Sequence, residues 1–216
     1  VGLGAAVFSV EILPARARLG FKAALELLAG IPSVVYGLLG ILFLRNWVYD
    51  LFAPWEPASG DTLLTAGLLV GVMILPTLMT LADDALAGVG AAQREAARGL
   101  GLTRAETVWG VVLPQAWPGI LAAILLALGR ALGEMIAVFL VVGRQDHPWP
   151  ADWLTLGPLL EPGQTLASKL GSSEINIAYG DPVHWGALMS LGLILLVLVV
   201  SLTAAAFRLT RRSTDA

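Results

Sequence analysis

The strongest constraint on this sequence is a set of apolar runs, each about as long as a helix that crosses a bilayer. Four runs have this character, at positions 21–44, 62–81, 119–142 and 183–207. A helix needs roughly 20 predominantly apolar residues to cross the hydrocarbon core. Backbone polar groups find no water there, so the chain must satisfy them within itself, as a helix does. We therefore predict an all-α, polytopic bundle of transmembrane helices in a lipid bilayer.

The composition excludes an ordinary water-soluble domain. Of the 216 residues, 57% are hydrophobic and 13% are charged, whereas charged residues make up roughly 25% of a typical soluble domain. The net charge is −3 and the sequence has no basic cluster, which argues against nucleic acid as a partner. The absence of cysteine excludes disulfides and thiol chemistry.

The start of the chain lies inside an apolar stretch, at Val1, without a methionine or a basic leader. We interpret 1–13 as the tail of a helix whose beginning is missing. The whole chain, 1–216, is then a single transmembrane domain that is incomplete at its N-terminus. In the first complete span, 21–44, Pro32 removes a backbone donor and predicts a bend.

Lysine and arginine predict the orientation, because they collect in loops on the cytoplasmic side. They form three groups: Arg16, Arg18 and Lys22; Arg94, Arg98 and Arg104; and Arg208, Arg211 and Arg212. Alternating crossings place the three groups on one face. We therefore expect a cytoplasmic loop at 82–117, with Asp83 and Asp84 at the exit of the second span, and a periplasmic loop at 143–182.

The periplasmic loop is interpreted as an interfacial cap, with a short helix at 165–174, that also meets a periplasmic binding protein. A metal site is the alternative. The two histidines, His147 and His184, lie far apart and have no carboxylate at ligand spacing. We therefore predict no metal site.

Between two apolar runs lies one polar, glycine-punctuated segment, 95–114, with the sequence EAARGLGLTRAETVWGVVLP. Its first part is rich in helix formers, and Gly101 allows a turn. Thr103 and Glu106 have the spacing of a capping box, which predicts the start of a second short helix. Pro114 and Pro118 are expected to close that helix. The segment suits docking into a groove on another protein; an ordinary amphipathic loop at the membrane surface is the alternative.

Charged residues also occur inside the predicted spans. Arg130 and Glu134 lie four residues apart in the third span, which would place them on one helix face. A charge at the centre of a membrane helix costs on the order of 2.5 to 3.5 kcal/mol, so both groups need partners or a watery path. Either Arg130 meets an anionic substrate, with Glu134 balancing it, or the two form an ion pair that only fixes helix packing. Glu26 in the first complete span has the same two readings.

The sequence contains no catalytic motif. There is no GxxxxGK[ST] loop for ATP, and no GxSxG or HExxH pattern for a membrane hydrolase. We predict no catalytic residue and no cofactor bound by this chain. A passive channel and a membrane enzyme remain the alternatives to a driven transporter.

The polar segment resembles the signature of the permease subunits of bacterial ABC importers, EAA, three residues, G, nine residues, an aliphatic residue, any residue, LP. The residues that match the signature are Glu95, Ala96, Ala97, Gly101, Val111, Leu113 and Pro114. Val111 stands where isoleucine is usual. The resemblance implies that these residues couple the permease to two copies of a cytoplasmic ABC ATPase, which binds the ATP.

Two further stretches, ELLAGIPSVVYG at 26–37 and GRALGEMIAV at 129–138, resemble the permease subunits of the bacterial phosphate ABC importer, more the PstC type than the PstA type. This resemblance implies a multi-pass protein of the bacterial inner membrane with about six spans. It also implies a related PstA-type permease as heterodimer partner, a periplasmic phosphate-binding protein, and a role in reporting phosphate to a sensor kinase.

By the same resemblance, Arg130 and Glu134 are the family's membrane-embedded charged pair in the substrate path. Glu26 is assigned to that path from its charge within the first predicted span. Met135 stands where threonine is usual after the glutamate. A permease for another oxyanion, such as molybdate or sulfate, is the alternative within the same class.

Overall fold

The computed structural model describes residues 2–11, 13–146, 155–172, 176 and 179–214. In these residues all regular structure is helical, and β-type pairing is limited to one isolated bridge between Gly143 and Gly163. The predicted all-α fold is confirmed.

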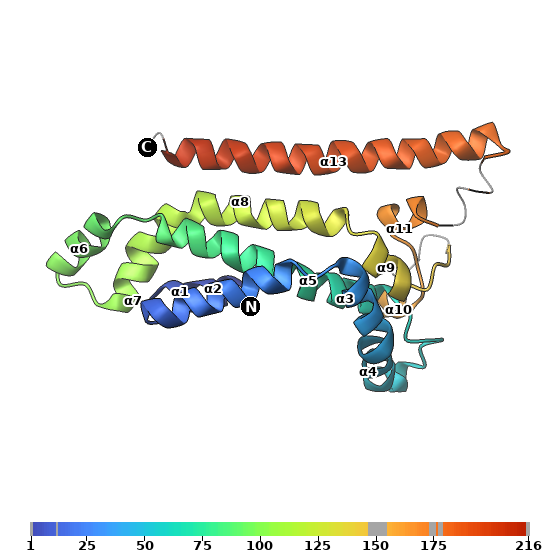
Figure 1. Cartoon of the computed structure of the whole chain (residues 1–216), viewed down its shortest axis with the longest axis horizontal. Helices are drawn as coiled ribbons and strands as arrows, with labels where there is room; N and C mark the ends of the chain where they lie inside the picture. Colours follow the sequence, from blue (N-terminus) through green and yellow to red (C-terminus); the bar gives the residue numbers. More distant parts are fainter. Residues whose placement is uncertain (1, 12, 147–154, 173–175, 177–178, 215–216) are drawn as a thin grey trace. The chain divides into compact units, whose positions relative to one another are not determined.

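The elements follow one another along the chain as shown in Figure 1. They are α1 (Gly2–Glu11), α2 (Ala15–Ala29), α3 (Ser33–Leu39), the π-helix η1 (Gly40–Leu44), α4 (Arg45–Leu51), the 3-10 helix η2 (Ala53–Trp55), α5 (Leu63–Ala87), α6 (Ala91–Gly99), α7 (Arg104–Thr107), the π-helix η3 (Val108–Val112), α8 (Leu113–Leu132), α9 (Ile136–Val141), α10 (Gly157–Leu160), α11 (Leu166–Leu170) and α13 (Pro182–Thr214).

In the described part of the chain, four helical stretches are long and apolar enough to cross a bilayer. These stretches are Ser33–Leu51, Leu63–Ala87, Arg104–Leu132 and Pro182–Thr210. The predicted number of spans is confirmed, although three of the four have other bounds than the apolar runs suggested.

The predicted first span, 21–44, is wrong. Helix α2 ends at Ala29, and a new helix begins at Ser33 and runs to Leu51, into the expected outer loop. Pro32 has no N–H to donate to the preceding turn, so the helix stops and restarts there instead of bending. The span-length helix therefore starts after the proline.

The predicted third span, 119–142, is also displaced. One continuous helix runs from Arg104 to Leu132, so Pro114 and Pro118 do not end it. The π-helix η3 lies directly before Pro114, and its last turn closes with a hydrogen bond from the Leu113 N–H to the Val108 carbonyl. This widened turn leaves room for the proline ring, which would otherwise press on the carbonyl one turn back.

The predicted exit of the second span is wrong as well. Helix α5 continues to Ala87, so Asp83 and Asp84 lie within it. Asp83 is only 4% exposed. A buried carboxylate needs a partner, and Arg18 provides it.

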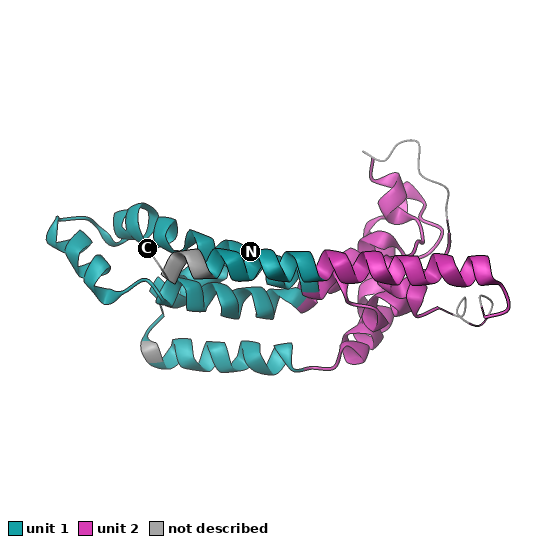
Figure 2. Cartoon of the chain, turned by 90° about the horizontal axis from the view of Figure 1, so that it is seen from above, with its two compact units in different colours: residues 1–30, 74–129, 200–216 teal, residues 31–73, 130–199 magenta. Residues whose placement is uncertain are grey.

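The chain forms two compact units, coloured separately in Figure 2. Unit 1 consists of residues 1–30, 74–129 and 200–216, and unit 2 of residues 31–73 and 130–199. Each has its own apolar core.

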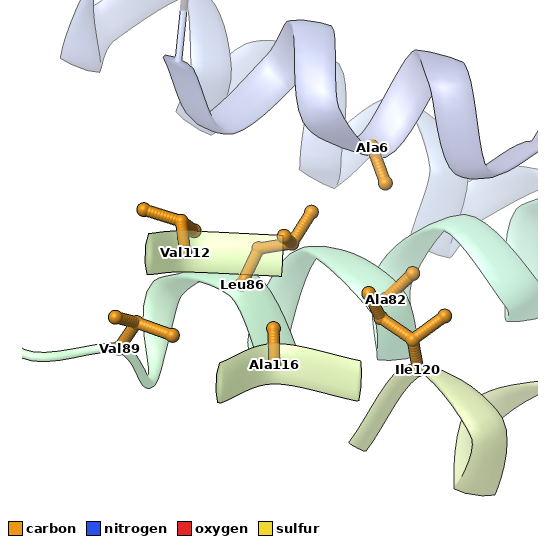
Figure 3. Packing of buried hydrophobic residues seen from close by; sticks show 7 residues of the cluster. All are labelled: Ala6, Ala82, Leu86, Val89, Val112, Ala116 and Ile120. Carbon is orange, nitrogen blue, oxygen red and sulfur yellow. The ribbon is translucent and has the colours of Figure 1, made fainter. Parts of the chain in front are cut away.

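The core of unit 1 brings together α1, the second half of α5 and the helix that begins at Arg104. Figure 3 shows its side chains pointing toward one another: Ala6, Ala82, Leu86, Val89, Val112, Ala116 and Ile120. Several are alanines, which lets the helix backbones approach closely. At Gly119 a Cβ atom would lie 2.7 Å from the Cβ of Ala85, so only glycine fits that contact.

The core of unit 2 brings together α3, η1, the first half of α5 and α9. Its buried residues are Ala66, Leu69, Met73, Ala137, Val138, Val141 and Val142. At Gly37 a Cβ atom would lie 2.5 Å from the Leu140 side chain and 3.1 Å from the Ala137 Cα. Helices α3 and α9 therefore meet nearly backbone to backbone.

This close contact predicts that Gly37→Ala destabilises the protein by about 1–3 kcal/mol, as overpacking does. The loss should exceed the ~1 kcal/mol by which alanine favours a helix over glycine. The midpoint of thermal unfolding of the purified protein in detergent measures the effect. Gly71→Ala is the matched control, because no atom of the described residues lies within 4 Å of its Cβ position. Equal midpoints for the two variants would contradict the contact.

Candidate functional site

The polar segment forms two short helices, α6 and α7, joined by a turn (Figure 1). Glu95, Ala96 and Ala97 lie in α6, where Glu95 and Ala96 are exposed and Ala97 is buried. The prediction of a helix, a turn and a second helix is confirmed. The exposed part of α6 is the part that another protein could contact.

The turn depends on the backbone of Gly101. Its φ of +83° lies in the left-handed region that only glycine adopts freely. The Gly101 and Leu102 N–H groups donate to the carbonyls of Arg98 and Ala97, at 2.9 and 3.2 Å, and so satisfy the end of α6. No atom of the described residues lies within 4 Å of the Gly101 Cβ position, so the demand for glycine is conformational and not steric.

Helix α7 begins with the predicted capping box. The Glu106 N–H donates to Thr103 Oγ1 at 3.3 Å, and the Thr103 N–H donates to Glu106 Oε2 at 2.7 Å. From there the chain is helical without a break through Val111, Leu113 and Pro114 to the end of α8. Movement of α7 would therefore be carried directly into a span.

Two apolar side chains on this segment were not singled out by the sequence analysis. Leu100, in the turn, is 84% exposed, and Trp109, in η3, is 74% exposed. For Leu100, the signal in the sequence was an apolar residue beside Arg98 and the glycines of the turn; Trp109 lies among apolar residues and gave no such signal.

Helix α2 is held to the end of α5 by two ion pairs within unit 1. Arg18 donates to both carboxylate oxygens of Asp83, at 3.3 and 2.8 Å, and the Lys22 amine donates to Asp84 at 2.5 Å. The hydrogen bond to Asp84 raises the pKa of Lys22, so this side chain stays charged. From the sequence alone, Arg18 and Lys22 indicated only the orientation of the chain.

Arg130 and Glu134 do not share a helix face, so that prediction is wrong. Helix α8 ends at Leu132, and Glu134 lies in the break before α9. Glu134 Oε1 accepts a hydrogen bond from the Ala137 N–H at 3.2 Å, which satisfies a free donor at the start of α9. Arg130 lies in the last turn of α8 and is exposed.

Glu26 lies in α2, which is not one of the four span-length helices. It is exposed on α2, which belongs to unit 1, whereas Arg130 and Glu134 belong to unit 2. The prediction that Glu26 lies in the first complete span is wrong, because that span begins at Ser33.

A pocket of about 260 Å³ lies within unit 2, next to the break. Residues of α5, α8, α9, α11 and α13 line it, and most of them are apolar. Glu134 and Thr165 are polar side chains in its lining, and Ala131, the neighbour of Arg130, contributes as well. The break between α8 and α9 thus places the carboxylate of Glu134 in the lining of a mostly apolar pocket.

The expected short helix in the loop 143–182 exists as α11, which begins with a capping box of Thr165 and Ser168. His147 lies outside the described residues. In the described part of the chain, no three His, Cys, Asp or Glu side chains come together in a way that could hold a metal.

Comparison with known proteins gives one family. The family model described as "Binding-protein-dependent transport system inner membrane component" matches residues 2–215. No solved structure matches the chain.

Among curated proteins, "Phosphate transport system permease protein PstC 2" of Mycobacterium tuberculosis is 36% identical over 222 residues, covering 95% of this chain and 66% of the relative. "Phosphate transport system permease protein PstC" of Pasteurella multocida is 36% identical over 214 residues, covering 92% and 64%. The protein of the same name in Mesorhizobium japonicum is 32% identical over 222 residues, covering 95% and 65%. The chain therefore spans about two thirds of the length of these relatives.

The capping box predicts a local effect of Thr103→Ala. The change removes the acceptor of the Glu106 N–H, so the start of α7 should fray. Hydrogen exchange of the amides at 103–108, followed by mass spectrometry, should become several-fold faster than in the wild type. Thr103→Ser keeps the hydroxyl and should exchange as the wild type does. Unchanged exchange in the alanine variant would show that α7 does not depend on the cap.

Proposed function

Because this chain belongs to the family of binding-protein-dependent transport system inner membrane components, we propose that it is the permease subunit of an ATP-driven importer of inorganic phosphate. The multi-pass helical fold suits this role. The observation that carries the proposal is the exposed α6–turn–α7 segment, in which α7 continues as one helix into a span. The relatives of this chain are named phosphate permeases.

The proposed energy source is a cytoplasmic ABC ATPase, present in two copies and binding the ATP. In this proposal the chain itself hydrolyses nothing and binds no cofactor. The ATPase would grip α6 and the turn, where Glu95, Ala96 and Leu100 are exposed. Its closure would move α7, and the continuous helix Arg104–Leu132 would carry that movement into the membrane.

The proposed cargo is phosphate. The planar guanidinium of Arg130 offers paired N–H donors that fit the oxygens of a tetrahedral oxyanion. Glu134, four residues on at the pocket, would repel an anion and so favour its release once the path opens. Sulfate and molybdate have the same shape, and a permease for one of them is the alternative.

The proposed assembly contains a second, PstA-type permease and a periplasmic phosphate-binding protein. The cytoplasmic side is proposed to hold 82–117, where α6 and α7 lie, and the periplasmic side to hold 143–182. A passive channel is the alternative from another class. It would take up phosphate in proteoliposomes that lack the ATPase, whereas the proposed importer would not.

The left-handed backbone of Gly101 predicts that Gly101→Val uncouples transport from ATP use. A β-branched residue at φ +83° is strained, so the joint between α6 and α7 must distort. We expect phosphate taken up per ATP hydrolysed, in proteoliposomes containing the complete importer, to fall at least several-fold. Gly99→Val is the matched control: the Cβ position of Gly99 is equally open, but its φ is not positive. Equal coupling in both variants would count against the proposal that α6 and α7 carry the movement of the ATPase into the span.

The proposed role of Arg130 in binding phosphate predicts that Arg130→Gln lowers phosphate uptake at least tenfold while the importer still assembles. The change keeps the size of the side chain but removes its charge and its paired donors. Radiolabelled phosphate uptake measures the effect, and co-purification of the ATPase is the control for assembly. Wild-type uptake in this variant would remove the assigned role, and competition by excess sulfate or molybdate in the wild type would favour the alternative cargo.

A further inference from the structure

Arg94 is the residue directly before the exposed Glu95, and its side chain turns inward. Its Nη2 donates to the Leu86 carbonyl at 2.8 Å and its Nε donates to the Val89 carbonyl at 3.3 Å. The Leu86 carbonyl lies in the last turn of α5 and the Val89 carbonyl lies two residues past its end, where helical donors run out. Arg94 therefore completes the end of α5 from α6.

The same guanidinium also reaches α1. Its Nη1 donates to Glu11, the last residue of α1, which lies 83 positions away in the sequence. The two side chains are only 17% and 15% exposed. An ion pair this sheltered is screened little by water or salt, and removing one partner leaves the other poorly compensated.

The ion pairs of α2 continue the arrangement. Asp83 and Asp84, one turn before Leu86 on α5, hold Arg18 and Lys22. At this end of unit 1, α1 is thus joined to α6 and α2 to α5 through charges, while Arg94 joins α6 to α5 through carbonyls. All of these contacts lie within unit 1.

The covalent connection between α5 and α6 offers little stiffness of its own. It runs through Gly88, Val89 and Gly90, and its two glycines make this backbone intrinsically more pliable than a helix. A push on α6 could be absorbed there. Arg94 spans this link, since its Nη2 holds the Leu86 carbonyl on the far side of it, while its Nε holds the Val89 carbonyl within it.

We propose that Arg94 is a positioning residue that transmits the displacement of α6 to α1 and to the end of α5. It contacts neither cargo nor nucleotide. The proposal rests on the proposed function, because it assumes that an ATPase moves α6. On the same turn of α6, Glu95 faces outward, where the ATPase would contact it, and Arg94 faces inward, where it would transmit the displacement.

The first test measures coupling in the reconstituted importer. Arg94→Gln should keep ATPase co-purification and basal ATP hydrolysis, while phosphate uptake per ATP falls at least tenfold. Glu11→Gln breaks only the ion pair and should give a smaller loss. Arg208→Gln, an exposed arginine of unit 1 on α13, is the matched control and should couple as the wild type does. Wild-type coupling in Arg94→Gln, or a loss explained entirely by a missing ATPase, would overturn the proposal.

The second test does not depend on transport. The 216 residues contain no cysteine, so spin labels can be directed to Gly4→Cys on α1 and Ala92→Cys on α6, two exposed positions, in an importer whose other parts are made cysteine-free. In the assembled importer, Arg94→Gln should broaden the distribution of distances between the labels, and an unchanged distribution would overturn the proposal. If the wild type shows this rigid link but no ATP-driven uptake, the proposed function fails while the role of Arg94 in the link stands.

Should Arg94→Gln fail to fold, Arg94→Lys is the second variant. Lysine keeps the charge for Glu11 but cannot hold both carbonyls and the carboxylate at once. We expect a label distribution of intermediate width and a partial loss of coupling. A lysine variant identical to the wild type in both measurements would show that the carbonyl contacts transmit nothing.

Discussion

Backbone hydrogen bonding away from water is the constraint on which this structure depends. Inside a bilayer each N–H and C=O group needs a partner from the protein itself, and long helices supply it. Where a helix must stop, a side chain completes the bonding instead. Glu134 accepts the Ala137 N–H at the start of α9, and Arg94 donates to the carbonyls of Leu86 and Val89 at the end of α5. Two of the polar residues proposed for function, Glu134 and Arg94, thus close helix ends.

The two units divide the chemistry between them. Unit 1 holds the exposed segment of α6 and α7 and the ion pairs of Arg18, Lys22 and Arg94. Unit 2 holds Arg130, Glu134 and the apolar pocket. In each unit helices meet through small residues, as at Gly119 and Gly37, where no Cβ fits without a shift. Tight contacts of this kind move as rigid pieces, which a lever-driven transporter requires.

Local patterns made much of this structure predictable. Runs of about 20 apolar residues indicated an all-α membrane protein with four spans, because their length matches the bilayer whatever their partners are. Thr103 and Glu106 predicted the start of α7, since a capping box involves only residues three apart. The bounds were less predictable. Pro32 stops one helix and Pro114 lies inside another, because a π-turn before Pro114 makes room for the ring.

By itself, then, the sequence determined the fold class, the number of spans, the α6–turn–α7 segment and the need for glycine at its turn. Only the tertiary structure decided the partners of the charges. Arg18 meets Asp83 across 65 positions and Arg94 meets Glu11 across 83, and no local spacing encodes such a pair. It also separated Arg130 and Glu134, which the spacing had placed on one face, because α8 ends between them. Short-range hydrogen bonds depend on residues a few positions apart, whereas ion pairs between helices depend on how whole helices pack.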